Sequence, residues 1–202
     1  MERRIFKLKE TTYIEIISDA WHLNEKWWNA LMRLKPKERH YLYGNKVPRD
    51  YVVYGKSYRF SNQNHQPQPM PYVIRQLMKR ANRLVFKESK NNAYNSIRYN
   101  MALVNWYLDE NDSIYPHSDN ENEMLRDENG DTYPVACFSF GETRRFVLKS
   151  KKKSEKLSID LEPNSLVVMG GKCQTNYTHA IPKEKIPKSI RISVTFRVFK
   201  DI

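Results

Sequence analysis

The sequence predicts a mainly β fold in which two N-terminal helices buttress a β-sandwich or barrel. Its 202 residues suit one domain with a sizeable core. Two segments in the first half carry apolar residues at helical spacing, whereas short segments rich in β-branched and aromatic residues follow one another from residue 93 onward. No repeat or flexible linker divides the chain. We therefore expect a single domain over residues 1–202, with 1–46 as an N-terminal extension and 93–199 as the core.

The first predicted helix covers residues 24–35, NEKWWNALMRLK. Asn24 is a residue type that caps helix N-termini, and Pro36, just beyond the segment, is a stop signal. The apolar side chains of this segment are Trp27, Trp28, Leu31, Met32 and Leu34.

The second predicted helix covers residues 72–86, YVIRQLMKRANRLVF, and follows a turn-rich segment. Its apolar residues recur at helical spacing, so this stripe should pack on a sheet. Basic residues occupy the other faces and are expected to be solvated. The stripe consists of Val73, Ile74, Leu77, Ala81, Leu84 and Val85.

The second half of the chain reads as a series of strands. Several short strands with close turn signals favour a sandwich or barrel over βαβ units, and we expect the chemistry to lie inside it. The predicted strands lie within residues 97–108, 133–141, 144–150, 156–161, 165–171, 174–181 and 190–199.

The composition excludes a disordered chain and a membrane span. Hydrophobic residues make up 40% of the sequence, and no run approaches the roughly 18 apolar residues that a span requires. The N-terminal segment lacks the apolar core and cleavage site of a secretory signal, so we expect an intracellular protein, in the nucleus or cytoplasm. Cys137 and Cys173 are too few for a disulfide framework and are expected to be buried free thiols.

The charge of the chain bears on its partners. The formal net charge of +12 favours attraction to polyanions such as nucleic acid, although basic enzymes without such partners are common. The segment KSKKKSEK, residues 149–156, lies between two predicted strands. It is either a solvated hairpin tip or a loop that grips phosphates.

A possible metal site begins with the pair His117 and Asp119. On a strand, residues two apart point to the same face, so both side chains could reach one ion. A third ligand must come from elsewhere, and His179 at the end of another predicted strand is the best candidate. Two histidines and one carboxylate form the facial triad of non-haem Fe(II) oxygenases. A polar surface loop is the alternative for the pair taken alone.

Two further strands carry polar side chains at alternate positions. In residues 190–199 the alternation places a polar set opposite an apolar set, and its two arginines suit the carboxylates of a diacid. An exposed strand face is the alternative. Asn105 and Tyr107 also share a face and could donate to a carboxylate, unless Asn105 only has local partners. The polar set is Arg191, Ser193, Thr195 and Arg197.

Taken together, these motifs resemble the AlkB-type Fe(II)/2-oxoglutarate-dependent dioxygenases, particularly the nucleic acid demethylases among the vertebrate AlkB homologues. The resemblance covers residues 47–199 and implies a double-stranded β-helix, or jelly roll, which agrees with the predicted strands. The segments that carry it are VPRDYVVYGKSYRFS, LVNWYLDENDSIYPHSDNE, ACFSFGETRRFVLK, NSLVVMGG, THAIPKEK and RISVTFR.

The resemblance also implies roles for individual residues. It implies a base pocket in which Tyr58 and Phe60 stack on the base, and Asn120 and Glu121 read its edge. Tyr43 corresponds loosely to a wedge that enters duplex DNA in some relatives. Ser193 departs from the family, which commonly has Asn there, and this bears on 2-oxoglutarate affinity. The implied iron ligands are His117, Asp119 and His179, and the implied 2-oxoglutarate residues are Asn105, Tyr107, Arg191, Thr195 and Arg197.

The activity that the resemblance implies is oxidative demethylation of alkylated bases in DNA. Fe(2+) with 2-oxoglutarate and O2 as co-substrates would release the methyl group as formaldehyde, with succinate and carbon dioxide as products. The base would have to be flipped out or already unpaired, and the enzyme would act as a monomer. The alternatives are an RNA demethylase, a non-catalytic nucleic-acid-binding relic and a protein hydroxylase. The Arg191 and Arg197 pair argues against the hydroxylase.

Overall fold

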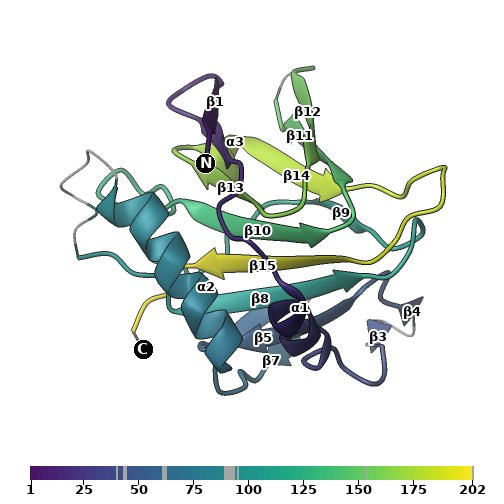
Figure 1. Cartoon of the computed structure of the whole chain (residues 1–202). Coiled ribbons are helices and arrows are strands. Elements are labelled where there is room, and N and C mark those ends of the chain that lie inside the picture. The colour runs from purple at the N-terminus through teal and green to yellow at the C-terminus, as the bar shows by residue number, and fades with distance from the viewer. Residues whose placement is uncertain are drawn as a thin grey trace.

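The computed structural model describes residues 1–39, 41–42, 45–60, 63–88, 94, 96–152 and 154–201 of the chain, with the side chains of 41–42, 45–46, 58–60 and 63–65 left out. Within this part the chain forms two antiparallel sheets packed as a sandwich, with helices on the outer face of the larger sheet (Figure 1). The predicted mainly β fold is confirmed.

The larger sheet has seven strands, and its central strands are buried on both faces. Both faces are covered because helices lie on one side and the smaller sheet on the other, so these strands are apolar along most of their length. Across the sheet the strands are β1 (Arg3–Lys7), β2 (Tyr13–Ile17), β13 (Ser165–Gly170), β10 (Val135–Gly141), β15 (Arg191–Arg197), β8 (Met101–Tyr107) and β5 (Asp50–Tyr54).

The larger sheet extends beyond the predicted core of 93–199. Strands β1 and β2 come from the segment 1–46, and β2 pairs with β13, so this segment forms one side of the sheet as well as a helix. Strand β5 pairs with β8 on the other side. These strands are five residues long. Such short strands are stabilised by their neighbours in the sheet, which a local pattern does not reveal.

The smaller sheet has four strands: β12 (Lys156–Leu161), β11 (Arg144–Ser150), β14 (Tyr177–Ile181) and β9 (Ile114–His117). Strand β9 lies at its edge, which suits Pro116 because proline has no N–H for a ladder bond. His117 in β9 lies directly opposite His179 in β14. Two separate hairpins are formed by β3 (Tyr41–Leu42) with β4 (Asn45–Lys46) and by β6 (Tyr58–Phe60) with β7 (Gln63–His65).

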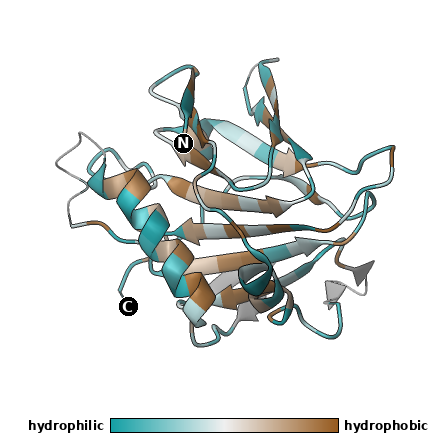
Figure 2. Ribbon diagram, viewed as in Figure 1, coloured by the Kyte–Doolittle hydropathy of each residue, from teal (hydrophilic) through white to brown (hydrophobic). Residues whose placement is uncertain are grey.

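Two main helices lie on the outer face of the larger sheet (Figures 1 and 2). Helix α1 (Glu25–Met32) begins after Asn24, whose side chain accepts a hydrogen bond from the Trp27 N–H. Helix α2 (Tyr72–Asn82) continues as a π-helical turn, η1 (Arg83–Lys87), and packs its apolar stripe against β15. A short helix, α3 (Cys173–Asn176), precedes β14. None of the described helices is both long and apolar enough to cross a membrane.

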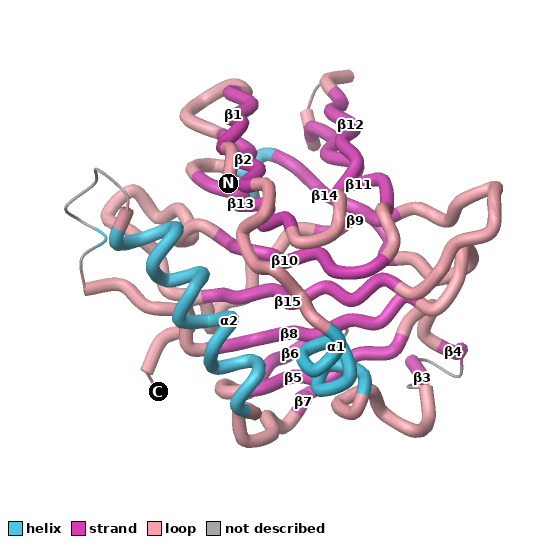
Figure 3. The backbone as a smooth tube through the Cα atoms, viewed as in Figure 1, coloured by secondary structure: helices cyan, strands magenta, loops and turns pink. Residues whose placement is uncertain are grey.

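Strand β15 separates two apolar cores. One core lies between the larger sheet and the helices, and the other lies between the two sheets. The alternation predicted for β15 is present: Ile192, Val194 and Phe196 enter the first core. The polar set of β15 faces the space between the sheets instead. The loops that leave β8 and β14 gather at one end of this space (Figure 3).

Candidate active site

The candidate active site is a cavity of about 50 Å³ between the two sheets. The larger sheet contributes side chains from β8 and β15, and the smaller sheet contributes side chains from β9 and β14. The cavity therefore collects residues that are far apart in the sequence. It is lined by all the residues predicted to hold iron or 2-oxoglutarate: His117, Asp119, His179, Asn105, Tyr107, Arg191, Thr195 and Arg197.

The predicted metal ligands lie together beside the smaller sheet. One side-chain ligand atom from each of His117, Asp119 and His179 lies within 4.8 Å of the others. The Nε2 atoms of His117 and His179 lie 3.7 Å from the Oδ1 and Oδ2 atoms of Asp119, respectively. The backbone differs from the prediction in one respect. Strand β9 ends at His117, so Asp119 reaches the cluster from the following loop and not from a shared strand face.

The protonation of this cluster suits a cation. Burial lowers the pKa of His179 to about 3, with the nearby His117 adding to the effect, and burial also lowers the pKa of His117. Burial disfavours the charged form of Asp119, but the charge and hydrogen bond of Arg197, together with the two neighbouring histidines, outweigh it and hold the pKa of that carboxyl below its usual value. At neutral pH the site therefore presents two neutral imidazoles and one carboxylate.

The donor set fits Fe(2+). Asp119 Oδ2 is buried, makes no hydrogen bond and lies 3.7 Å from His179 Nε2. Buried polar atoms are nearly always satisfied, so an unpaired carboxylate oxygen beside two imidazoles is what a metal-ligand set presents to its ion. A divalent cation would compensate the buried carboxylate and accept a lone pair from each imidazole.

Two residues make hydrogen bonds that hold Asp119 in place. Arg197, which is fully buried, donates from Nη2 to Asp119 Oδ1 at 2.5 Å. Gln174 in α3 accepts a hydrogen bond from the Asp119 backbone N–H at 2.9 Å. Arg197 thus serves the carboxylate in this structure, and its contact with 2-oxoglutarate stays a prediction. Gln174 could not be identified from its sequence context, because only the folded chain brings it to this loop.

Arg191 lies on the same strand as Arg197, at its other end, and offers a site for an acidic group. Its Nε and Nη2 donate to Ser139 Oγ at 3.0 and 2.7 Å, and its guanidinium lies 5.1 Å from the centre of the Tyr107 ring. Its Nη1 is buried without a hydrogen-bond partner. A carboxylate that entered the cavity would supply the missing acceptor. Beside it, Thr195 Oγ1 donates to Cys137 Sγ at 3.3 Å.

Asn105 has a partner that the sequence did not reveal. Its Oδ1 accepts from Arg49 Nε at 2.8 Å, and its Nδ2 lies 3.4 Å from Ser193 Oγ. Arg49 is itself buried, and its guanidinium lies 5.8 Å from the centre of the Tyr51 ring. The local partners proposed as the alternative for Asn105 are therefore present, while its side chain still borders the cavity. The amide nitrogen carries two hydrogens, so one donor remains for a co-substrate.

Of the predicted base-reading residues, the two whose side chains are described, Asn120 and Glu121, do not line this cavity. Asn120 is exposed and accepts from Arg126 Nη2 at 2.8 Å, and Glu121 lies partly buried beside it. The side chains of Tyr58 and Phe60 lie outside the described part of the chain, and so does Tyr43. Their roles in substrate binding stay predictions.

Sequence comparison identifies the family. Residues 7–197 match the model of the family described as the 2OG-Fe(II) oxygenase superfamily. The chain belongs to this superfamily. Membership of the 2OG-Fe(II) oxygenases implies Fe(2+), 2-oxoglutarate and O2, which confirms the predicted cofactor and co-substrates and agrees with the cluster of His117, Asp119 and His179.

Individual 2OG-Fe(II) oxygenases resemble the chain in part. It is 30% identical over 160 residues to the alpha-ketoglutarate-dependent dioxygenase alkB homolog 3 of Homo sapiens, covering 74% of this chain and 51% of that protein. It is 29% identical over 162 residues to the DNA oxidative demethylase ALKBH2 of Bos taurus, covering 75% and 53%. The chain thus spans about half the length of these relatives.

A solved structure agrees on the fold. The structure of OsALKBH1 superimposes with a TM-score of 0.64, covering 96% of this chain and all of that one at 16% sequence identity. This likeness supports the predicted jelly-roll fold.

Proposed function

We propose that this 2OG-Fe(II) oxygenase removes alkyl groups from bases in DNA. The observation that carries the proposal is the joint presence, in one cavity, of the cluster of His117, Asp119 and His179 and of an arginine, Arg191, with an unpaired donor. The first suits iron and the second suits a carboxylate.

The residues would divide the work between metal and co-substrate. His117, Asp119 and His179 would hold iron, with Arg197 keeping Asp119 ionised and oriented. Arg191 would bind one carboxylate of 2-oxoglutarate, assisted by Tyr107 and Thr195. When bound, iron and 2-oxoglutarate supply the oxidising chemistry together with O2. The protein's own part is to hold both partners in register and to exclude water between two apolar sheets.

DNA as the substrate is supported by a relative and by the charge of the chain. The relative ALKBH2 is named a DNA oxidative demethylase, and the net charge of +12 favours a polyanion. An alkylated base would have to leave the duplex to reach the cavity. We assign its recognition to four residues and place the enzyme, as a monomer, in the nucleus or cytoplasm. The four residues are Tyr58, Phe60, Asn120 and Glu121.

Turnover with defined oligonucleotides tests the proposal. The full chain is loaded with Fe(2+) and 2-oxoglutarate without oxygen and then exposed to air with methylated DNA or RNA of the same sequence. Mass spectrometry should show loss of one methyl group from DNA and formation of succinate, and neither should occur with His117→Ala. Faster turnover of RNA would show that RNA, and not DNA, is the preferred substrate. Succinate formation without demethylation of either would contradict it.

A further inference from the structure

Arg144, in strand β11, is fully buried and binds backbone carbonyls instead of a carboxylate. Its Nη1 donates to the carbonyl of Asp109 at 3.0 Å, and its Nη2 donates to the carbonyls of Asp112 at 2.7 Å and Pro182 at 2.9 Å. Burying a charge without a direct counter-ion is costly, and an apolar residue of similar volume would fill the space more cheaply. The position of the three carbonyls suggests what Arg144 does.

The three carbonyls belong to the two segments that flank the metal cluster. Asp109 and Asp112 lie in the loop between β8 and β9, which leads directly to His117. Pro182 follows the last residue of β14, three positions after His179. One guanidinium therefore fixes the distance between the start of β9 and the end of β14.

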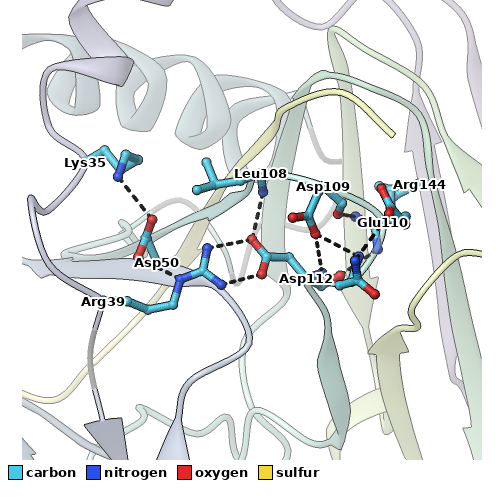
Figure 4. Close-up of polar contacts among 9 residues, drawn as sticks. Lys35, Arg39, Asp50, Leu108, Asp109, Glu110, Asp112 and Arg144 are labelled. Carbon is cyan, nitrogen blue, oxygen red and sulfur yellow. Dashed lines mark hydrogen bonds and ion pairs between the residues drawn. The ribbon is translucent and has the colours of Figure 1, made fainter. Parts of the chain in front are cut away.

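A second arginine holds the same loop from its other side (Figure 4). Arg39 Nη2 donates to Asp112 Oδ2 at 2.9 Å, and Asp112 Oδ2 also accepts from the Leu108 N–H at 2.8 Å. Arg39 Nε also reaches Asp50 in β5 at 3.3 Å. The loop is thus clamped between β5 of the larger sheet and β11 of the smaller one.

Arg144 also touches the other half of the cavity. Its guanidinium lies 5.6 Å from the centre of the Tyr107 ring, and that of Arg191 lies 5.1 Å from the same ring. Arg144 and Arg191 therefore contact the same ring, and Arg144 packs against the residue that borders the site of Arg191.

We propose that Arg144 is a positioning residue that sets the spacing of the two metal-bearing strands and fixes the Tyr107 ring beside the co-substrate. The inference rests on the proposed iron site. The guanidinium reaches these carbonyls from two nitrogens held in one plane, whereas lysine has a single nitrogen on a flexible stem, so we expect lysine not to replace arginine here. Supporting groups of this kind typically change metal affinity by about 10- to 100-fold.

The test measures Mn²⁺ binding to the full chain, without turnover, by the electron paramagnetic resonance signal of the free ion. In Arg144→Lys and Arg144→Gln the dissociation constant for Mn²⁺ should rise about 10- to 100-fold. Two controls should stay within about twofold of the wild type. Arg145→Gln removes the neighbouring arginine, which is partly exposed and pairs with Glu184 at the surface. Leu77→Ala destabilises the helix-covered core away from the cavity.

The outcomes are separable. Wild-type affinity in Arg144→Lys, or an equal loss in Leu77→Ala, would overturn the positioning role. Mn²⁺ binding that survives in His117→Ala would instead refute the iron site itself.

A measurement on the wild type covers the case in which the variants do not fold. Because linkage is reciprocal, Mn²⁺ should slow hydrogen exchange in residues 108–113 and 182–184, although no ligand lies there. Unchanged exchange in both segments would overturn the inference.

Discussion

Asp119 is a buried carboxylate that depends on its surroundings for its charge. It lies beside two histidines and accepts a hydrogen bond from Arg197, and both partners of this pair are at least 98% buried by side chain. Removing one member of a buried ion pair leaves the other uncompensated. We therefore expect the contact with Arg197 to bear both on stability and on the metal binding proposed for Asp119.

We expect Asp119→Asn to abolish metal binding and turnover. It should also lower the free energy of unfolding of the metal-free protein by about 3 kcal/mol, since Arg197 loses its counter-ion. Urea unfolding and calorimetric titration with Mn²⁺ measure the two effects. The double variant Asp119→Asn, Arg197→Met should recover part of the lost stability but no metal binding. A fully stable single variant would mean that solvent compensates Arg197.

The two arginines of β15 should behave differently. Arg191→Met removes the unpaired donor and should raise the 2-oxoglutarate dissociation constant by an amount equivalent to about 2–4 kcal/mol, while Mn²⁺ affinity stays unchanged. Arg197→Met should weaken Mn²⁺ binding as well, because it supports Asp119. Binding assays with each ligand in turn separate the effects. Unchanged 2-oxoglutarate binding in Arg191→Met would mean that the diacid lies elsewhere.

His179 makes the stability of the metal-free protein depend on pH. Its pKa is lowered from 6.5 to about 3, so the unfolded chain takes up the proton first as pH falls. The stabilising effect of a neutral His179 is complete above the unfolded value and is lost as pH falls toward the folded value. We expect a loss of about 1.4 kcal/mol per pH unit below pH 6 from this residue.

Urea unfolding at several pH values between 7 and 5 checks this expectation. The slope should be shallower in His179→Gln and unchanged in His22→Gln, which alters an exposed histidine. Equal slopes in the wild type and His179→Gln would contradict the argument.

At the scale of secondary structure, helix α1 offers a clean test of a local signal. The Asn24 side chain accepts from the Trp27 N–H at 3.1 Å, which satisfies one of the free donors of the first turn. Asn24→Ala should lower the free energy of unfolding by about 1 kcal/mol, and Asn24→Asp should preserve it. Thermal unfolding followed by circular dichroism measures both. Equal loss in the two variants would show that the cap contributes nothing.

Strand β15 shows what a local pattern can predict. Its alternation of polar and apolar residues indicates both faces correctly, because the faces of a strand follow from its own repeat. The same rule failed for Asp119, which lies beyond the end of its strand. Arg49, Gln174 and Arg144 could not be assigned from the sequence. Each acts through a partner distant in the chain, and only the fold brings the two together.

At the scale of the whole molecule, the lysines of the segment 149–156 differ in whether they contact other parts of the protein. In the segment 149–156, for which a solvated hairpin tip and a phosphate-gripping loop are the alternatives, Lys151 donates to the carbonyl of Gln174 at 2.9 Å, and Lys153 lies outside the described residues. Lys149, Lys152 and Lys156 are exposed on the smaller sheet and its hairpin. These three lysines are therefore the better candidates for contacts with a nucleic acid backbone.

Neutralising those three lysines to Gln should weaken binding to methylated and unmethylated oligonucleotides alike. The slope of log affinity against log salt should become shallower by about two to three units if all three contact phosphates. Lesion preference should not change, since phosphates carry no base information. Arg75→Gln with Lys79→Gln, on the solvent face of α2, is the control and should change little. A shifted lesion preference would contradict a pure backbone role.

The position of β2 has a consequence for how the chain folds. Ile17 pairs with Leu166, and β2 joins the sheet only through β1 and β13. Ile14, Ile16 and Ile17 of β2 are synthesised early, but β13, the strand with which they pair, is synthesised about 150 residues later. Pairing β2 with β13 closes a long loop, and the entropy lost in closing it slows folding. The high contact order of the sandwich slows folding further. Until β13 pairs with it, the hairpin of β1 and β2 has an unpaired strand edge to which other chains could bind.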